Sequence, residues 1–142
     1  PEQLVGREVA HLSHGVYASE EYLSKKRTEE HLILWLHDKH QPEWVLDHFP
    51  GARVVARVSE IMTMMETVKN HLGMARMPCY VGDAEPSLRR LDLQLTQSNW
   101  GVWVLSHPDL RTTSRVRACR EFLIESIKQQ RSLIEGLESR YA

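Results

Sequence analysis

The sequence predicts an α/β domain built on a parallel sheet, and three observations indicate it. An apolar, β-branched run at 52–58 is followed by a helical pattern from Ile61 to Leu72. A further apolar segment, 74–80, comes directly after Gly73. A strand, a helix and a strand within about thirty residues form a βαβ unit, which needs a crossover helix between parallel strands. Such units bind ligands near the carboxyl ends of their strands, so we expect a small-molecule site there.

Short elements are expected before this unit. Residues 9–12 and 16–18 are typical of short extended segments. Ser19 is suited to cap a short helix after it, because its hydroxyl can accept a hydrogen bond from a first-turn amide. Residues 32–36 have the length and composition of a buried strand. Proline-containing turns then bound a predicted helix over Glu43 to His48.

The helix from Ile61 to Leu72 carries its apolar side chains three and four residues apart, on one face. Gly73 is predicted to take the left-handed conformation that ends this helix. After a turn at 82–86, residues 88–93 are expected to be extended, and 94–99 form a polar connector.

The last predicted strand covers residues 100–106, and the longest helix begins near 112–114. Ser132 or Gly136 is expected to kink or fray this helix late. We expect its apolar stripe to be covered by another chain or by a rearranged packing. That stripe consists of Val116, Cys119, Leu123, Ile127, Ile134 and Leu137.

Composition excludes several function classes. The chain has 142 residues, enough for one domain with a buried core. Eighteen Lys and Arg against nineteen Asp and Glu give a net charge of -1, so no overall basic field would attract nucleic acid. No apolar run approaches the roughly 18 residues of a membrane span, so no membrane partner is expected. Cys79 and Cys119 are widely separated, which is typical of reduced thiols in the cytoplasm.

Nearly the whole chain carries motifs of one known family, in the same order as in that family. The strongest motif is Val68 to Arg90. The others are Leu4 to Arg7, Val16 to Ser19 with Tyr22-Leu23, Trp35 with Asp38, Pro50 to Val55, Trp103 to Arg111, and Ser114 to Ala118 with Phe122-Leu123. In these motifs the chain resembles the effector-binding domain of LysR-type transcriptional regulators, truncated at its N-terminal side.

The resemblance implies an α/β fold like that of a type II periplasmic binding protein, with two lobes joined by two crossing strands. One complete lobe plus the C-terminal part of the other lobe would be present. On this basis 1–15 is a crossing segment from the first lobe and 16–98 is the second regulatory lobe. Residues 99–142 would be the return crossing strand and C-terminal helix of the first lobe. The winged helix-turn-helix and most of the first lobe would lie outside this chain.

The resemblance also implies an effector bound between the lobes. The matching positions are Val58, Ser59, Glu60, Ile61, Pro78, Cys79, Tyr80 and, at the hinge, Tyr17. Amides at a helix start attract anions, which suits the small carboxylates or aromatics that this family often senses, although Glu60 would oppose an anion. Structural roles stay open as alternatives: an N-cap for Ser59, a solvated first-turn acid for Glu60, and packing for Tyr80.

Metal binding and catalysis find little support. His11 with His14 and His37 with His40 form pairs, but zinc needs three or four converging ligands and no second pair answers either one. We therefore expect solvated loop histidines, no metal and no cofactor. Neither a G-x-S-x-G elbow, a P-loop nor an HExxH motif is present, so we expect no enzymatic activity. Acidic residues offset the basic side chains of the C-terminal helix, which favours a solvated face.

We therefore expect the effector-sensing domain of a LysR-type regulator, cytoplasmic and self-associating as a dimer or higher oligomer. A small-molecule effector would shift the population of inter-lobe angles, and DNA would be contacted only through a helix-turn-helix domain outside this chain. Two alternatives stay open. One is a periplasmic type II solute-binding protein, against which the absence of a signal-peptide pattern counts. The other is an oligomerisation module without ligand function.

Overall fold

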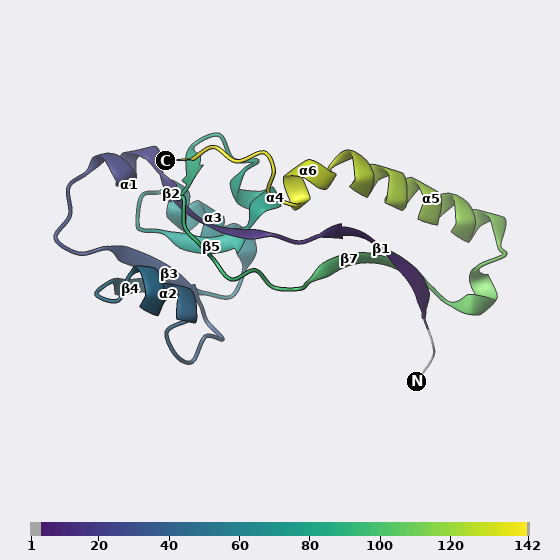
Figure 1. Ribbon diagram of the computed structural model, residues 1–142, viewed down its shortest axis with the longest axis horizontal. Coiled ribbons are helices and arrows are strands. Elements are labelled where there is room, and N and C mark those ends of the chain that lie inside the picture. The colour runs from purple at the N-terminus through teal and green to yellow at the C-terminus, as the bar shows by residue number, and fades with distance from the viewer. Residues whose placement is uncertain (1–3, 142) are drawn as a thin grey trace.

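The structure is a computed structural model, in which residues 4–141 are described. The molecule is elongated, with a lobe at one end and, extending from it toward the other end, a two-stranded ribbon with a long helix beside it (Figure 1). The strands are β1 (Val5–His11), β2 (His14–Ser19), β3 (His31–Trp35), β4 (Arg53–Val58), β5 (Ala75–Pro78), β6 (Leu88–Arg90) and β7 (Gly101–Ser106). The helices are α1 (Glu20–Ser24), α2 (Glu43–His48), α3 (Ile61–Lys69), α4 (Cys79–Gly82), α5 (Ser114–Gln129) and α6 (Arg131–Ile134), with a 3-10 turn at Pro108–Leu110.

The lobe, residues 14–93, is built on a mixed sheet. β3 and β4 pair in parallel, and β2 lies between β5 and β6 with antiparallel pairing to both. A parallel bridge between Leu32 and Met74 joins these two sheets edge to edge. The predicted βαβ unit is thereby confirmed as β4–α3–β5, with β3 lying between its two strands.

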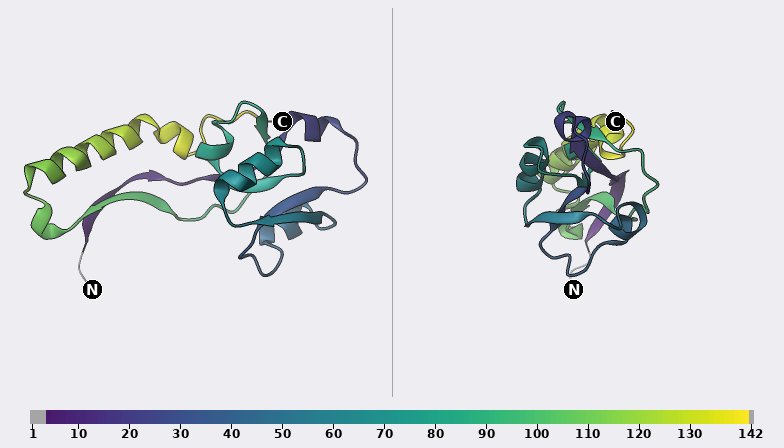
Figure 2. Two further views of the ribbon diagram at one scale, coloured as in Figure 1. Left: turned by 180° about the vertical axis from the view of Figure 1, so that it is seen from behind. Right: turned by 90° about the vertical axis from the view of Figure 1, so that its left-hand side faces the viewer.

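Apolar side chains fill both faces of this sheet. Val16 and Leu32 contribute to a cluster that α1 and α2 cover, whereas Tyr17 and Ile33 contribute to a cluster on the side of α3. Neighbouring residues point to opposite faces because side chains alternate along a strand. The two helices α2 and α3 therefore lie on opposite sides of the sheet (Figure 2).

The end of α3 differs from the prediction. The helix stops at Lys69, and the left-handed residue is His71, with φ of 65°, instead of Gly73. Gly73 is required for another reason: a Cβ there would lie 2.6 Å from the carbonyl oxygen of His31. Close approach of two backbones, which no local pattern reveals, sets this position.

Other local predictions have mixed outcomes. The helix over Glu43 to His48 is confirmed, and the Ser19 hydroxyl accepts a hydrogen bond from the Tyr22 amide at 3.1 Å, as a cap does. The extended segment predicted at 74–80 was too long, because the chain turns into α4 after Pro78.

β1 and β7 pair antiparallel from Val5–Ser106 to His11–Gly101, and we call this pair the ribbon. α5 lies along the ribbon (Figures 1 and 2). In the predicted apolar stripe, Val116 and Ile127 are half-buried and Cys119 and Leu123 are exposed. Coverage of the exposed part by another chain remains a prediction. A two-stranded ribbon is too narrow to cover more of the helix.

After α6 the chain returns to the lobe, where residues 135–141 end beside β6 (Figure 1). The helix is interrupted at Gln130, earlier than the predicted kink, and Gly136 takes a φ of 74°. The boundaries 1–15, 16–98 and 99–142 remain predictions.

Candidate functional site

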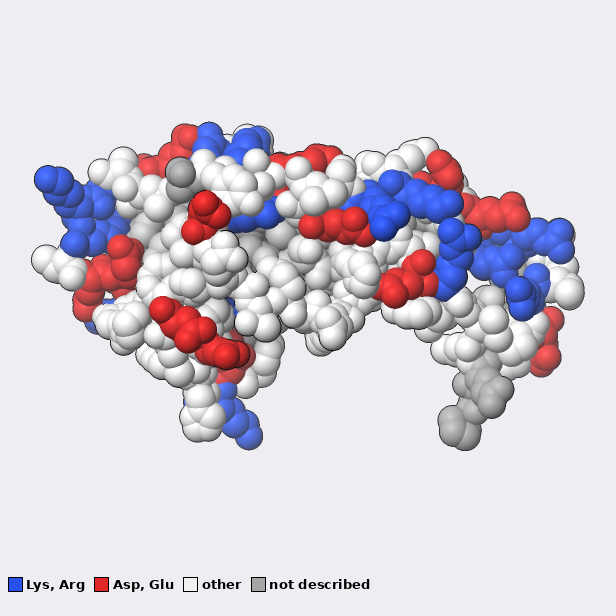
Figure 3. Space-filling view, viewed as in Figure 1, with Lys and Arg blue, Asp and Glu red and all other residues white. Residues whose placement is uncertain are grey.

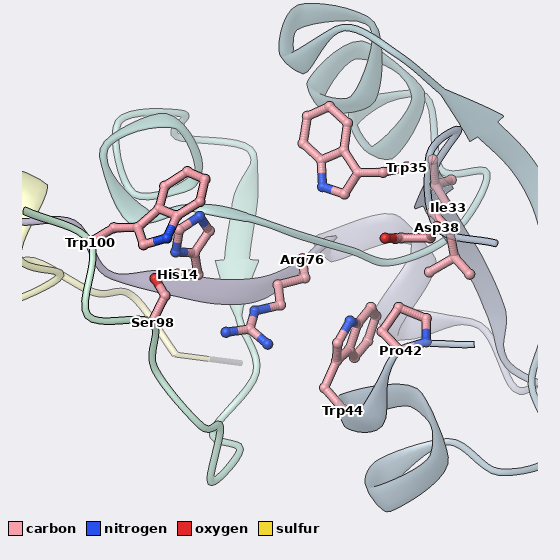
Figure 4. A pocket seen from close by; sticks show the side chains of 10 residues that line it. His14, Ile33, Trp35, Asp38, Pro42, Trp44, Arg76, Ser98 and Trp100 are labelled. Atoms are coloured by element: carbon pink, nitrogen blue, oxygen red, sulfur yellow. The ribbon is translucent and has the colours of Figure 1, made fainter. Parts of the chain in front are cut away.

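A cavity of about 310 Å³ lies where the lobe meets the ribbon (Figure 4). Tryptophan rings contribute much of its wall: Trp35 at the carboxyl end of β3, Trp44 in α2, and Trp100 just before β7. Carboxyl ends of sheet strands are where ligands bind in such folds. The full lining consists of His14, Ile33, Leu34, Trp35, Asp38, Pro42, Trp44, Arg76, Ser98 and Trp100.

Arg76 brings a positive charge into this cavity from β5. Its guanidinium lies between the side chains of His14 and Trp100 on one side and the Trp44 ring on the other (Figure 4). It donates a hydrogen bond of 2.8 Å to the carbonyl oxygen of Thr96. Burial lowers the pKa of Arg76 from its ordinary value, although a guanidinium remains protonated at neutral pH.

His14 supplies a neutral polar group next to this charge. Its backbone amide and carbonyl are both bound by the Gln97 side chain, at 3.0 and 2.9 Å. Its ring Nδ1 is buried and has no hydrogen-bond partner among residues 4–141. Burial, reinforced by the charge of Arg76, lowers the pKa of His14 below 6.5. The prediction of a solvated loop histidine was therefore wrong for this residue.

The connector 94–99 is attached to the lobe at three points. The His48 ring contacts the Gln94 carbonyl oxygen at 2.9 Å, and the Arg76 and Gln97 contacts hold the rest. Because the connector leads directly to Trp100, these contacts fix how one wall of the cavity is presented.

Four predicted site residues lie at the end of β4 and the start of α3, beside the cavity but outside its lining. Val58 pairs with Trp35, and Ile61 packs in the core cluster under α3. Ser59 and Glu60 are exposed, and Glu60, not Ser59, is the N-cap residue of α3. Val58 and Ile61 share the core cluster under α3 with Ile33 and Trp35, two residues of the cavity lining.

The other four predicted residues lie in three elements: Tyr17 in β2, Pro78 at the end of β5, and Cys79 and Tyr80 in α4. Tyr17 and Cys79 are fully buried, so their side chains belong to the core in this conformation. The Tyr17 hydroxyl donates to Asp83 at 2.8 Å, and burial raises the pKa of the Cys79 thiol. Pro78 pairs with His14, and Tyr80 is exposed.

None of the eight predicted positions, all within the described chain, lines the cavity. Two missed residues had a sequence signal. Arg76 is a lone charge inside the apolar segment 74–77, and Trp35 directly follows a buried strand. Trp44, His14 and Trp100 come from distant segments and had no such signal.

Among residues 4–141, no group of three or more His, Cys, Asp or Glu is arranged to hold a metal ion. In the same range no helix has the length and apolar character needed to cross a membrane.

Comparisons with known proteins identify relatives of this arrangement. The regulatory domain of CrgA, a LysR-type transcriptional regulator from Neisseria meningitidis, superposes with a TM-score of 0.63 at 16% identity, over 86% of this chain and 68% of that domain. For a longer CrgA structure the TM-score is 0.67 at 20% identity, over 87% of this chain and 48% of that one. The AmpR effector domain of Pseudomonas aeruginosa gives 0.59 at 18% identity, over 90% of this chain and 66% of that domain.

These likenesses establish the two-lobed α/β fold of type II periplasmic binding proteins. This chain spans about two thirds of the length of the CrgA regulatory domain and of the AmpR effector domain. A comparison with curated protein sequences found no match. The family model of the LysR substrate binding domain matches residues 1–128. Because the match covers most of this chain, the chain belongs to that family.

Proposed function

We propose that this chain is the effector-sensing domain of a LysR-type transcriptional regulator and that its cavity takes a small aromatic acid. The observation that carries the proposal is the lining itself, in which Trp35, Trp44 and Trp100 surround a single guanidinium, that of Arg76. No enzymatic role is proposed.

The ligand class follows from the chemistry of these groups. Tryptophan faces stack on planar rings, and a guanidinium binds a carboxylate through two parallel hydrogen bonds. The free His14 Nδ1 beside Arg76 offers a further polar contact. Asp38, across the cavity from His14, would repel a second carboxylate and favours a ligand with a hydroxyl or amino donor (Figure 4).

Arg76 also provides a route from ligand to conformation. A bound carboxylate would compete with the Thr96 carbonyl for the guanidinium and loosen the connector 94–99. The ligand would then have different affinities for two positions of the connector, which is what a population shift requires.

Thermal-shift and calorimetric titrations with benzoate, salicylate and indole-3-acetate test the proposal. A ligand that binds one site stabilises the folded state by about 2.7 kcal/mol when its free concentration is about 100 times its Kd. Arg76→Gln should abolish this stabilisation. Arg53→Gln, which changes an exposed guanidinium on β4, is the matched control and should leave it intact. A flat response to all three acids contradicts the ligand class, and stabilisation that survives Arg76→Gln contradicts the site.

Self-association and DNA targeting complete the proposal. The ribbon and α5 expose apolar surface that suits contact with another copy of the chain or with the rest of the first lobe. It includes Trp103 and Leu105 on the ribbon, 54% and 50% exposed, and Phe122 on α5. Acidic residues interrupt the basic side chains of α5 (Figure 3), so contact with DNA is assigned to a helix-turn-helix domain outside this chain. A cytoplasmic location agrees with two free thiols. Light scattering tests the association, which a monomer at every concentration would contradict.

A further inference from the structure

The C-terminal segment 135–141, which we call the strap, runs from the end of α6 onto the lobe (Figure 1). Next to the ribbon, the Ser13 amide donates to the carbonyl of Ile134, the last residue of α6, and the His11 amide donates to the carboxylate of Glu135, the first residue of the strap, both at 3.2 Å. At its end, the Arg90 amide donates to the Arg140 carbonyl at 2.8 Å. The strap is therefore a third connection across the joint, besides residues 12–13 and the connector 94–99.

Arg90 holds the strap with a side chain that the lobe has already fixed. Its guanidinium pairs with the Asp83 carboxylate, which is 1% exposed, and its Nε donates to the Tyr17 hydroxyl at 3.2 Å. From this position Nη1 donates to the Gly136 carbonyl at 3.0 Å. Because the guanidinium is ordered within the lobe, little further ordering is needed when the strap binds.

Arg140 makes the second attachment, in the opposite direction. Its guanidinium donates to the carbonyl oxygens of Asp83 and Glu85 at 2.8 and 2.9 Å. At the first attachment the strap packs closely against the lobe: a Cβ at Gly136 would lie 2.9 Å from the Cys79 sulfur.

The strap is held by hydrogen bonds and buries little apolar surface. Leu137, its large aliphatic residue, is 73% exposed. The lobe core under α3 and α2 contains no strap residue among those described. Segments with few buried apolar contacts open locally without unfolding the rest of a protein, so the strap can detach alone.

We propose that the strap is a releasable brace that fixes the angle between ribbon and lobe, and that its release frees rotation about residues 12–13 and 94–99. The angle matters because Ser98 and Trp100 line the cavity from this joint, whereas the rest of the wall belongs to the lobe. The inference does not rest on any ligand, so its failure would leave the proposed function standing.

Two measurements on Arg140→Ala test it, with Leu137→Ala as the matched control in the same segment. Hydrogen exchange of the Arg90 amide reports whether the strap is attached. Distances between spin labels on Cys119 and on Met62→Cys, two exposed sites on α5 and α3, report the angle. The buried Cys79 is left unchanged, because its sulfur packs against the strap.

Arg140→Ala should speed Arg90 amide exchange by at least about tenfold, because two hydrogen bonds of ordinary net strength supply that factor. It should also broaden the spin-label distance distribution, and Leu137→Ala should change neither. Exchange within about twofold of the parent protein overturns the attachment. Equal acceleration in Leu137→Ala also overturns it, and faster exchange with an unchanged distance distribution overturns the brace.

Discussion

Gly73→Ala should destabilise the lobe strongly, because this position joins the two halves of its sheet. The added Cβ would lie 2.6 Å from the carbonyl oxygen of His31 and 2.9 Å from its carbonyl carbon, and both are backbone atoms that cannot rotate away. That carbonyl accepts from the Met74 amide at 2.9 Å, and the Ile33 amide donates to the Met74 carbonyl at 2.8 Å. Relieving the clash therefore means separating a hydrogen-bonded pair of strands.

The cost can be worked from these contacts. Two hydrogen bonds of about 1 kcal/mol each are weakened, and overpacking adds about 1 kcal/mol or more, which gives a loss of roughly 3 kcal/mol. For a chain of this size that lowers the Tm by roughly 10 °C. Thermal and urea unfolding followed by circular dichroism measure both quantities.

Gly51→Ala is the matched control, because a Cβ there meets no atom within 4 Å. It should be neutral or stabilising by a few tenths of a kcal/mol, through loss of freedom in the unfolded chain. Gly73→Asn separates the two explanations for Gly73. Asparagine tolerates a left-handed conformation but is larger than alanine, so it should cost at least as much as alanine. A loss below about 1 kcal/mol in either Gly73 variant would refute the close-approach explanation.

Three further predictions concern single side chains. Asp83→Ala leaves the buried guanidinium of Arg90 without its partner and should lower the free energy of unfolding in urea by about 3–5 kcal/mol. The control Asp109→Ala, at a carboxylate that is 86% exposed, should change it by no more than about 0.5 kcal/mol. Similar losses in the two variants would contradict the buried pairing. The pKa of His14 is lower when folded than the ordinary 6.5, so the unfolded chain binds the proton more tightly and stability falls as the pH drops through 6.5. His14→Gln should remove part of this loss between about pH 7.5 and about pH 5, and an unchanged difference in urea midpoints would count against it. In thiol titration with an aromatic disulfide, exposed Cys119 should react at once and Cys79, whose pKa burial raises, only after denaturant is added; two fast thiols would contradict its burial.

The fold was predictable where the signal is local. The apolar spacing of α3 and the β-branched composition of β4 lie within single segments, so the βαβ unit could be read from the sequence. The order of strands could not, since the bridge between Leu32 and Met74 joins segments far apart in the chain. The same limit explains the wrong role for Gly73: its constraint is the backbone of His31, and the left-handed conformation falls on His71.

The candidate site was less predictable than the fold. The resemblance pointed to the ends of β4 and β5 and to Tyr17 on β2. Tyr17 and Cys79 are core residues, and Ser59 and Glu60 are exposed. The cavity instead combines three residues of β3 with residues from β2, α2, β5, the connector and the loop after β3, together with Trp100. Arg76, a charge within an apolar strand, and Trp35, directly after a buried strand, stand out in their own segments.

The brace and the cavity share one joint, which makes effector affinity depend on the strap. In the structure with the strap attached, Trp100 and Ser98 line the cavity together with Arg76, so the attached state is the one with a complete wall. When only a fraction of molecules is competent to bind, the apparent Kd rises by the inverse of that fraction. Arg140→Ala, which touches no cavity residue, should therefore weaken binding of an aromatic acid while leaving the lobe folded. Calorimetry on this variant and on Leu137→Ala measures the effect, and equal or tighter binding in Arg140→Ala would break the link between strap and site.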